Sequence, residues 1–244
     1  MIIAESIGFA ATHSISEILG QIPEVEVSHG SQHFEEKAPL GQGSQSVGDF
    51  LSSMAEAKEA GRAPIAIHTL FPPQELKPAC DAAGCDYWLL VRDPVAQIDS
   101  CYAWIARSIL EGNANHFLQV LRISLNELTA AKMEASLPNA LYYYAVNHVL
   151  SYNFLALGLG AQPRKMEVLL SDEAAFREAF SIADDIDLPH FQGDTVHRAS
   201  HRAHSELDAL AAPQKELILD RYAMTIGERS YRLHDMQMLL GYRN

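Results

Sequence analysis

The sequence predicts an α/β protein in which a parallel sheet is flanked by helices on both faces. Short apolar or β-branched runs alternate along the chain with longer stretches of helical pattern, as in consecutive βαβ units. The run "APIAIHTL" is almost entirely apolar, as expected for a strand that is covered on both faces. No internal repeat is visible, so we expect one domain over residues 1–244.

The order of the expected elements follows from these patterns. Strands are expected in "MIIAESIG" (1–8), "EVEVSHG" (24–30), "APIAIHTL" (63–70), "DYWLLV" (86–91) and "KMEVLL" (165–170). Helices are expected in 14–22, 49–60, 72–84, 95–157 with a break near 137–139, 172–183, and through the C-terminal 206–242. The Gly-, Ser- and Gln-rich segment 30–48 is expected to be a surface loop that is mobile without ligand and lies over the site.

Composition and charge exclude several classes of partner. The 244 residues are 48% hydrophobic and 20% charged, which is typical of a soluble globular protein. Eighteen basic residues against 31 acidic ones give a net charge of −13, so nucleic acid and acidic membrane surfaces are not expected partners. The N-terminal segment has no basic region and no long apolar stretch follows it, so we expect a cytoplasmic protein without a membrane span.

The three cysteines are Cys80, Cys85 and Cys101. An odd count without a secretory signal is typical of reduced thiols in a cytosol. Cys80 and Cys85 could together help to hold a metal, but two cysteines alone make a weak site. We therefore expect no metal.

The segment "GFAATHS" (8–14) lies between the first strand and the first helix. Small residues let backbone N–H groups approach a ligand, and a helix N-terminus favours an anion. The alternative is an ordinary capped helix, with Thr12 or Ser14 as N-cap and Glu17 at the capping-box spacing from Ser14. The ATP-type pattern GxxxxGK[ST] is absent because no Gly-Lys pair follows, which disfavours a nucleotide-dependent kinase.

A second candidate anion site begins where the fourth apolar run stops. Arg92 ends this run, and Ser100 follows eight residues later on the expected next helix. A guanidinium fork and a hydroxyl could share one phosphate. The alternative is a solvated arginine at a strand-to-helix turn.

Together these segments resemble the sulfotransferase family, which uses 3′-phosphoadenosine 5′-phosphosulfate (PAPS) as sulfuryl donor. The segment "RDPVAQIDSCY" is similar to its signature RxPxDxxxSxY and keeps Arg92, Pro94, Ser100 and Tyr102. "FAATHSI" is similar to the first signature (K/R)SGTxxL, with Thr12 and Ile15 in matching positions. Three later segments also resemble segments of the family, namely "KMEVLLSDE", "VHRASHR" and the ending "LGYRN".

The resemblance implies a P-loop NTPase-like fold of the sulfotransferase type. It also implies sulfuryl transfer from PAPS to a hydroxyl or amine of a small-molecule or glycan acceptor, without a metal. Arg92 and Ser100 would bind the 3′-phosphate of the donor. The first-loop residues that would hold the phosphosulfate are Ala10, Ala11, Thr12, His13 and Ser14.

The chain departs from the first signature. Phe9 stands where the family has Lys or Arg, and Ala10 and Ala11 replace Ser and Gly. In the family this basic residue stabilises charge on the bridging oxygen during transfer. The alternative function is therefore a catalytically weakened relative that binds a nucleotide or another anion.

The resemblance also suggests a general base. His68 ends the third strand, where the family often carries a His or Glu that takes the acceptor's proton, and imidazole titrates near neutrality. His29, at the end of the second strand, is a second candidate. Arg198, His201 and Arg202 form a basic cluster that would close over the nucleotide, or else a solvated loop.

Overall fold

A computed structural model describes residues 1–30, 46–188, 191 and 211–243. Most of the expected loop 30–48 lies outside these residues, as does the basic cluster of Arg198, His201 and Arg202. The chain divides into two compact units: unit 1 is Met1–Arg92 with Leu155–Arg198, and unit 2 is Asp93–Phe154 with Ala199–Asn244. The expected single domain stays a prediction.

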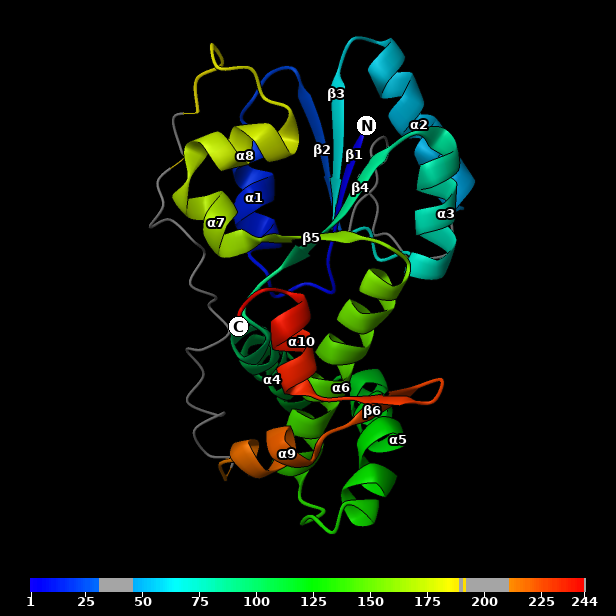
Figure 1. Ribbon diagram of the computed structural model, residues 1–244, viewed down its shortest axis with the longest axis vertical. Helices are drawn as coiled ribbons and strands as arrows, with labels where there is room; N and C mark the ends of the chain where they lie inside the picture. Colours follow the sequence, from blue (N-terminus) through cyan, green and yellow to red (C-terminus); the bar gives the residue numbers. More distant parts are fainter. Residues whose placement is uncertain (31–45, 189–190, 192–210, 244) are drawn as a thin grey trace. The chain divides into compact units, whose positions relative to one another are not determined.

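Unit 1 contains a five-stranded parallel sheet of order β2-β3-β1-β4-β5 (Figure 1). The strands are β1 (Ile2–Glu5), β2 (Val25–His29), β3 (Ala63–Ile67), β4 (Asp86–Val91) and β5 (Gln162–Lys165). The α/β fold class with a parallel sheet is therefore confirmed. The four predicted strands from the first 92 residues are confirmed as well, because three apolar runs and the alternating segment "EVEVSHG" can be recognised without tertiary context.

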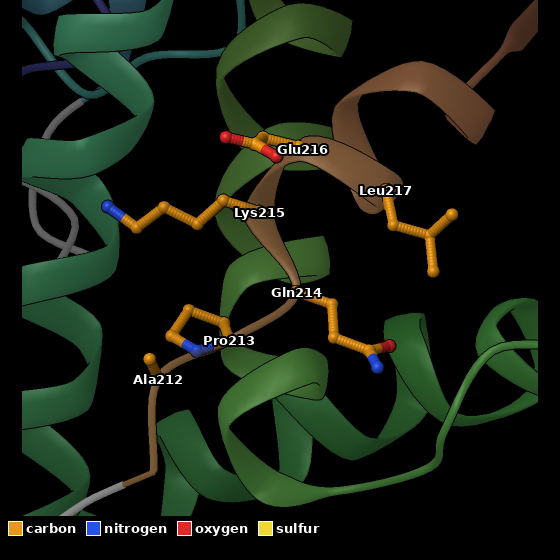
Figure 2. Close-up of a pocket in the computed structure, with 6 residues that line it drawn as sticks. All are labelled: Ala212, Pro213, Gln214, Lys215, Glu216 and Leu217. Carbon is orange, nitrogen blue, oxygen red and sulfur yellow. The ribbon is translucent and has the colours of Figure 1, made fainter.

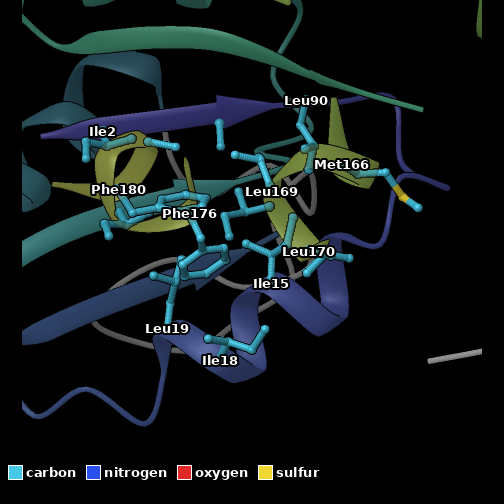
Figure 3. Close-up of a cluster of buried hydrophobic side chains, with 14 of the residues drawn as sticks. Ile2, Ile15, Ile18, Leu19, Leu90, Met166, Leu169, Leu170, Phe176 and Phe180 are labelled. Atoms are coloured by element: carbon cyan, nitrogen blue, oxygen red, sulfur yellow. The ribbon is translucent and has the colours of Figure 1, made fainter. Parts of the chain in front are cut away.

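Helices cover both faces of this sheet (Figure 1). Three pack on one face, namely α1 (Thr12–Leu19), α7 (Met166–Ser171) and α8 (Glu173–Phe180), and two on the other, α2 (Val47–Glu59) and α3 (Pro73–Ala83). On the first face, Ile15 and Leu19 of α1 pack with Phe176 and Phe180 of α8 and with Leu90 of the sheet in one buried cluster (Figure 3). This cluster fixes where α1 begins beside the sheet.

The fifth strand differs from the prediction. "KMEVLL" was predicted as a strand, but the structure places the strand at Gln162–Lys165 and a helix at Met166–Ser171. Met166, Leu169 and Leu170 are buried at spacings of three and four, which is the period of a helix face. The true strand, "QPRK", is a polar edge strand that pairs only with β4, so its sequence carries no apolar signal.

Truncating the aromatic centre of this cluster should destabilise unit 1. We expect Phe176→Ala to lower the free energy of unfolding by about 3 kcal/mol, because Phe176 is fully buried against Phe180 and Phe191. Urea denaturation measures the change. Phe117→Ala is the matched control: that side chain is 39% exposed, and its loss should cost less than about 0.5 kcal/mol. Equal losses in both variants would contradict the assignment of this core.

Unit 2 is mainly helical. Its elements are α4 (Pro94–Leu110), α5 (Ala114–Ala130), most of α6 (Leu137–Gly158), α9 (Lys215–Arg221), β6 (Met224–Ile226), β7 (Arg229–Tyr231) and α10 (Leu233–Leu239). The expected helical stretch 95–157 is broken at 111–113 and at 131–136, whereas 137–139 opens α6 with Pro138 in its first turn.

A small hairpin in unit 2 was missed by the sequence prediction. Strands β6 and β7 pair antiparallel within a segment that was expected to be helical throughout. The segment "TIGERS" does contain a turn signal, because glycine is favoured at the first position of a two-residue hairpin turn. Gly227 occupies that position with φ 61. The described helices include none with the length and hydropathy needed to cross a bilayer.

Candidate functional site

The carboxyl ends of three adjacent strands bring the predicted residues of unit 1 to one edge of the sheet. Ala4 of β1 is level with Ile67 of β3, and Glu5 is level with Leu89 of β4. The residues that follow these strands therefore leave the sheet at the same edge. In open parallel sheets this edge is where ligands bind.

The loop between β1 and α1 has an unusual backbone. Gly8, Phe9 and Ala11 take φ values of 93, 62 and 55, in the left-handed region that non-glycine residues seldom adopt. Ala11 is the N-cap of α1, and no side chain caps the helix there. The alternative of a Thr12 or Ser14 cap is therefore wrong, since both residues are buried within the first turn of the helix.

The start of α1 has general features that favour an anion. The first N–H groups of a helix have no partner within the helix, and its dipole places partial positive charge at the same end. Ala10 is fully buried behind the loop, while His13 is exposed. Backbone strain of this kind persists only where the surrounding structure enforces it, and it is concentrated at functional sites.

Arg92 lies against this loop. Its Nη1 donates to the carbonyl oxygen of Phe9 over 3.5 Å, so the guanidinium reaches from the end of β4 to the loop after β1. A cation therefore lies beside residue 9, although residue 9 itself is uncharged. Ser100 is in α4 of unit 2, where its Oγ donates to the carbonyl of Ala96 over 3.0 Å. That Arg92 and Ser100 bind the same phosphate stays a prediction.

His68 follows β3 directly, and its orientation is fixed. Its Nδ1 lies 2.6 Å from the carbonyl oxygen of Ser6. A carbonyl can only accept, so Nδ1 carries the proton and the lone pair of the neutral ring is on Nε2. The residue has φ 53, a left-handed conformation that histidine tolerates better than most residues. The fixed tautomer makes Nε2 the nitrogen that can take up a proton.

A buried carboxyl group supports this histidine, and the sequence analysis missed it. Glu5, at the end of β1, is fully buried, and its Oε2 accepts from the hydroxyl of Thr69 at 2.5 Å and from the N–H of Thr69 at 3.2 Å. Burial raises the pKa of Glu5, and the nearby His68 opposes this rise. Glu5 therefore fixes the residue that follows His68. The available signal was its position as a single charge in an apolar strand.

The other two histidines at this edge form ring contacts. The His13 and His29 rings have centroids 4.1 Å apart, and the His29 and His68 centroids are 5.8 Å apart. Burial, together with the charges of His13 and His68, lowers the pKa of His29 to about 3. A group that is so reluctant to accept a proton is a poor general base near neutrality. Of the two histidines proposed as base, His68 is therefore the better placed.

Gly30 is required for the position of His68. A Cβ at Gly30 would lie 2.5 Å from His68 Cδ2 and 2.7 Å from the His68 carbonyl oxygen. We expect Gly30→Ala to lower the free energy of unfolding by about 1–3 kcal/mol, because backbone and ring must both shift. Denaturant titration tests this.

Gly158→Ala is the matched control for that variant, since a Cβ there meets no atom within 4 Å and the residue has no positive φ. Its effect should be within about 1 kcal/mol, in the stabilising direction. Equal stability of the Gly30→Ala variant and the wild type would contradict the close packing of His68.

A hollow in unit 2 is lined by other residues. It has a volume of about 440 Å³ and is lined by Ala212–Leu217 at the start of α9 (Figure 2). Lys215 points to one side of this segment and donates to Asp99 Oδ1 at 2.8 Å, while Gln214 and Leu217 point to the other side (Figure 2). Of the predicted site residues that lie within the described ranges, none lines this hollow.

At the carboxyl edge of this open, parallel sheet lie a loop with left-handed residues, a neighbouring arginine and a histidine whose orientation is fixed. No protein-family model matches the sequence, and no curated protein matches it. Among solved structures, the chain is similar to the sulfotransferase from Alicyclobacillus acidocaldarius, with 14% identity and a TM-score of 0.47. That match covers 98% of this chain and 95% of the other. Within the described ranges, no group of His, Cys, Asp or Glu side chains is arranged to hold a metal ion.

Proposed function

We propose that this protein transfers a sulfuryl group from PAPS to a hydroxyl or amine acceptor. The observation that carries the proposal is the contact of Arg92 Nη1 with the Phe9 carbonyl, because it joins the two segments that resemble the sulfotransferase signatures. The two segments are 83 residues apart in sequence. The family resemblance predicts that the two segments are neighbours at one anion site, whereas their separation in the sequence does not predict that they meet.

The residues at this edge are suited to an anionic donor. The positive φ values of Gly8, Phe9 and Ala11, and the start of α1 without a side-chain cap, support binding of the phosphosulfate by the backbone of Ala10–Ser14. Arg92 would bind the 3′-phosphate through its planar fork, with Ser100 as the second ligand. Arg198 and Arg202 are further candidates for the nucleotide from outside the described residues. PAPS supplies an activated sulfuryl group whose leaving group is adenosine 3′,5′-bisphosphate.

His68 would act as the general base. The Ser6 carbonyl holds the proton on Nδ1, so Nε2 would accept the proton of the acceptor hydroxyl as the oxygen attacks sulfur. The resulting imidazolium would lie near the buried carboxyl group of Glu5, with which His68 interacts electrostatically. The acceptor class that we propose is a small molecule or a glycan with a free hydroxyl or amine.

Ligand-dependent thermal stability tests the donor assignment. We expect adenosine 3′,5′-bisphosphate to raise the melting temperature and ATP with Mg²⁺ to leave it unchanged. Arg92→Ala should remove most of the bisphosphate shift. If the bisphosphate stabilises the protein but no sulfuryl transfer occurs, the chain is a weakened, anion-binding relative. Stabilisation by ATP-Mg²⁺ alone would refute the proposal in favour of a kinase.

A further inference from the structure

Two cysteines are brought together at the end of α3, just before β4 begins and therefore at the opposite end of that strand from the candidate site. The helix ends at Ala83, and Gly84 takes the left-handed φ of 64. The N–H of Cys85 donates to the carbonyl of Cys80 over 2.9 Å, and that of Gly84 donates to Asp81 over 3.3 Å. These two bonds define a Schellman motif, in which the first and last residues normally bring their side chains into contact.

Here the two side chains in contact are thiols. Cys80 is fully buried, whereas Cys85 is partly exposed and follows the exposed segment 81–84. The neighbouring Cys80 thiol, together with the charges of the terminal amino group and of Lys58, lowers the pKa of Cys85 to about 7 against the effect of burial. The neighbouring Cys85 thiol, followed by burial, raises the pKa of Cys80. Cys85 is therefore the more thiolate-prone of the two residues.

We propose that Cys80 and Cys85 form a reversible intrachain disulfide, with Cys85 as the attacking thiolate and Cys80 as the resolving thiol. The motif already places the two residues within side-chain contact, and a disulfide needs Cα atoms only about 4.4–6.8 Å apart. The partly exposed Cys85 can meet a dissolved oxidant, while the buried Cys80 can react only with its neighbour. The site is independent of the proposed sulfuryl transfer.

The oxidant class that suits this arrangement is a small disulfide such as oxidised glutathione. The Cys85 thiolate attacks one glutathione sulfur, forms a mixed disulfide and releases the first glutathione as a thiolate. Cys80 then loses its proton and attacks the Cys85 sulfur, which releases the second glutathione. Two protein thiols are oxidised, and one glutathione disulfide is reduced to two glutathione molecules, which take up the two protons.

Cys101 provides an internal control. It is fully buried in α4, and burial raises the pKa of its thiol, so it should not react in the folded protein. After incubation of the folded full chain with oxidised glutathione, thiol titration in denaturant should fall from three thiols to one. Peptide mapping should find the Cys80–Cys85 bond, with a mass lower by two hydrogens, and dithiothreitol should restore all three thiols.

Single variants separate the two roles. Cys80→Ser should leave a stable glutathione adduct on Cys85, because no resolving thiol remains, and Cys85→Ser should form neither adduct nor disulfide. In the wild type, iodoacetamide at pH 7 should label Cys85 at least tenfold faster than Cys101. Three free thiols after oxidation of the wild type, or a disulfide that includes Cys101, would overturn the proposal. Both of these contradicting results are measured on the wild-type protein, so the test does not require that either variant folds.

Discussion

Replacing His68 by asparagine is expected to lower sulfuryl transfer by about 100- to 10,000-fold, the usual contribution of a general base. Asparagine keeps the features that fix residue 68 and removes only the basic nitrogen. It tolerates a φ of 53, and its amide can still donate to the Ser6 carbonyl. It has no group that can accept the acceptor's proton. The measurement is the turnover of PAPS with a hydroxyl acceptor under single-turnover conditions.

Two control measurements distinguish loss of the general base from loss of donor binding and from a general disturbance of the site. The thermal shift with adenosine 3′,5′-bisphosphate should be the same for His68→Asn and the wild type, because the base is not expected to contact the 3′-phosphate. His29→Asn is the neighbouring control: its pKa of about 3 already prevents it from acting as base, so transfer should fall by less than about tenfold. If His29→Asn abolished transfer while His68→Asn retained it, the roles of the two histidines would be reversed.

The sequence predicts an element correctly where a local residue pattern alone determines its secondary structure. Three of the four strands in the first 92 residues are short apolar runs between turn residues, and β2 is an alternating, β-branched one, so each can be located without knowing its neighbours. The edge strand "QPRK" has no such run, and only its pairing with residues 88–91 of β4 defines it as a strand. The hairpin at Gly227 is too short for periodicity to detect against the helical pattern on both sides.

The same distinction applies to the site. Arg92 and His68 could be proposed from their positions at strand ends, because parallel strands bring their carboxyl ends to one edge. The role of Gly30 could not be proposed in this way. Only glycine fits there because the ring of His68, 38 positions later, occupies the space that a Cβ would need. Glu5 likewise becomes meaningful only when β1 and β3 are paired and Thr69 reaches its carboxylate. Contacts of this kind depend on tertiary packing, which a local pattern does not encode.

Phe9→Lys is expected to raise sulfuryl transfer, or hydrolysis of PAPS, by about 100- to 1000-fold, the range that one transition-state donor usually contributes. In the wild type the loop offers backbone N–H groups, which bind an anion but neutralise little of the charge that develops on the bridging oxygen. Arg92 reaches the Phe9 carbonyl, yet the proposed function assigns it to the 3′-phosphate. Affinity for the bisphosphate should therefore survive in the wild type better than turnover does.

The substitution suits the loop because lysine at φ 62 is no more strained than phenylalanine. Phe9→Leu is the matched control: it changes the side chain at the same φ without adding charge, and should leave transfer near the wild-type rate. Arg92→Ala is the binding control, and in combination with Phe9→Lys it should lose bisphosphate affinity while the added cation remains. Brisk wild-type turnover that falls in Phe9→Lys would show that another cation already completes the loop. No bisphosphate binding in either protein, with Arg92→Ala causing no change, would remove the proposed function and leave the fold alone.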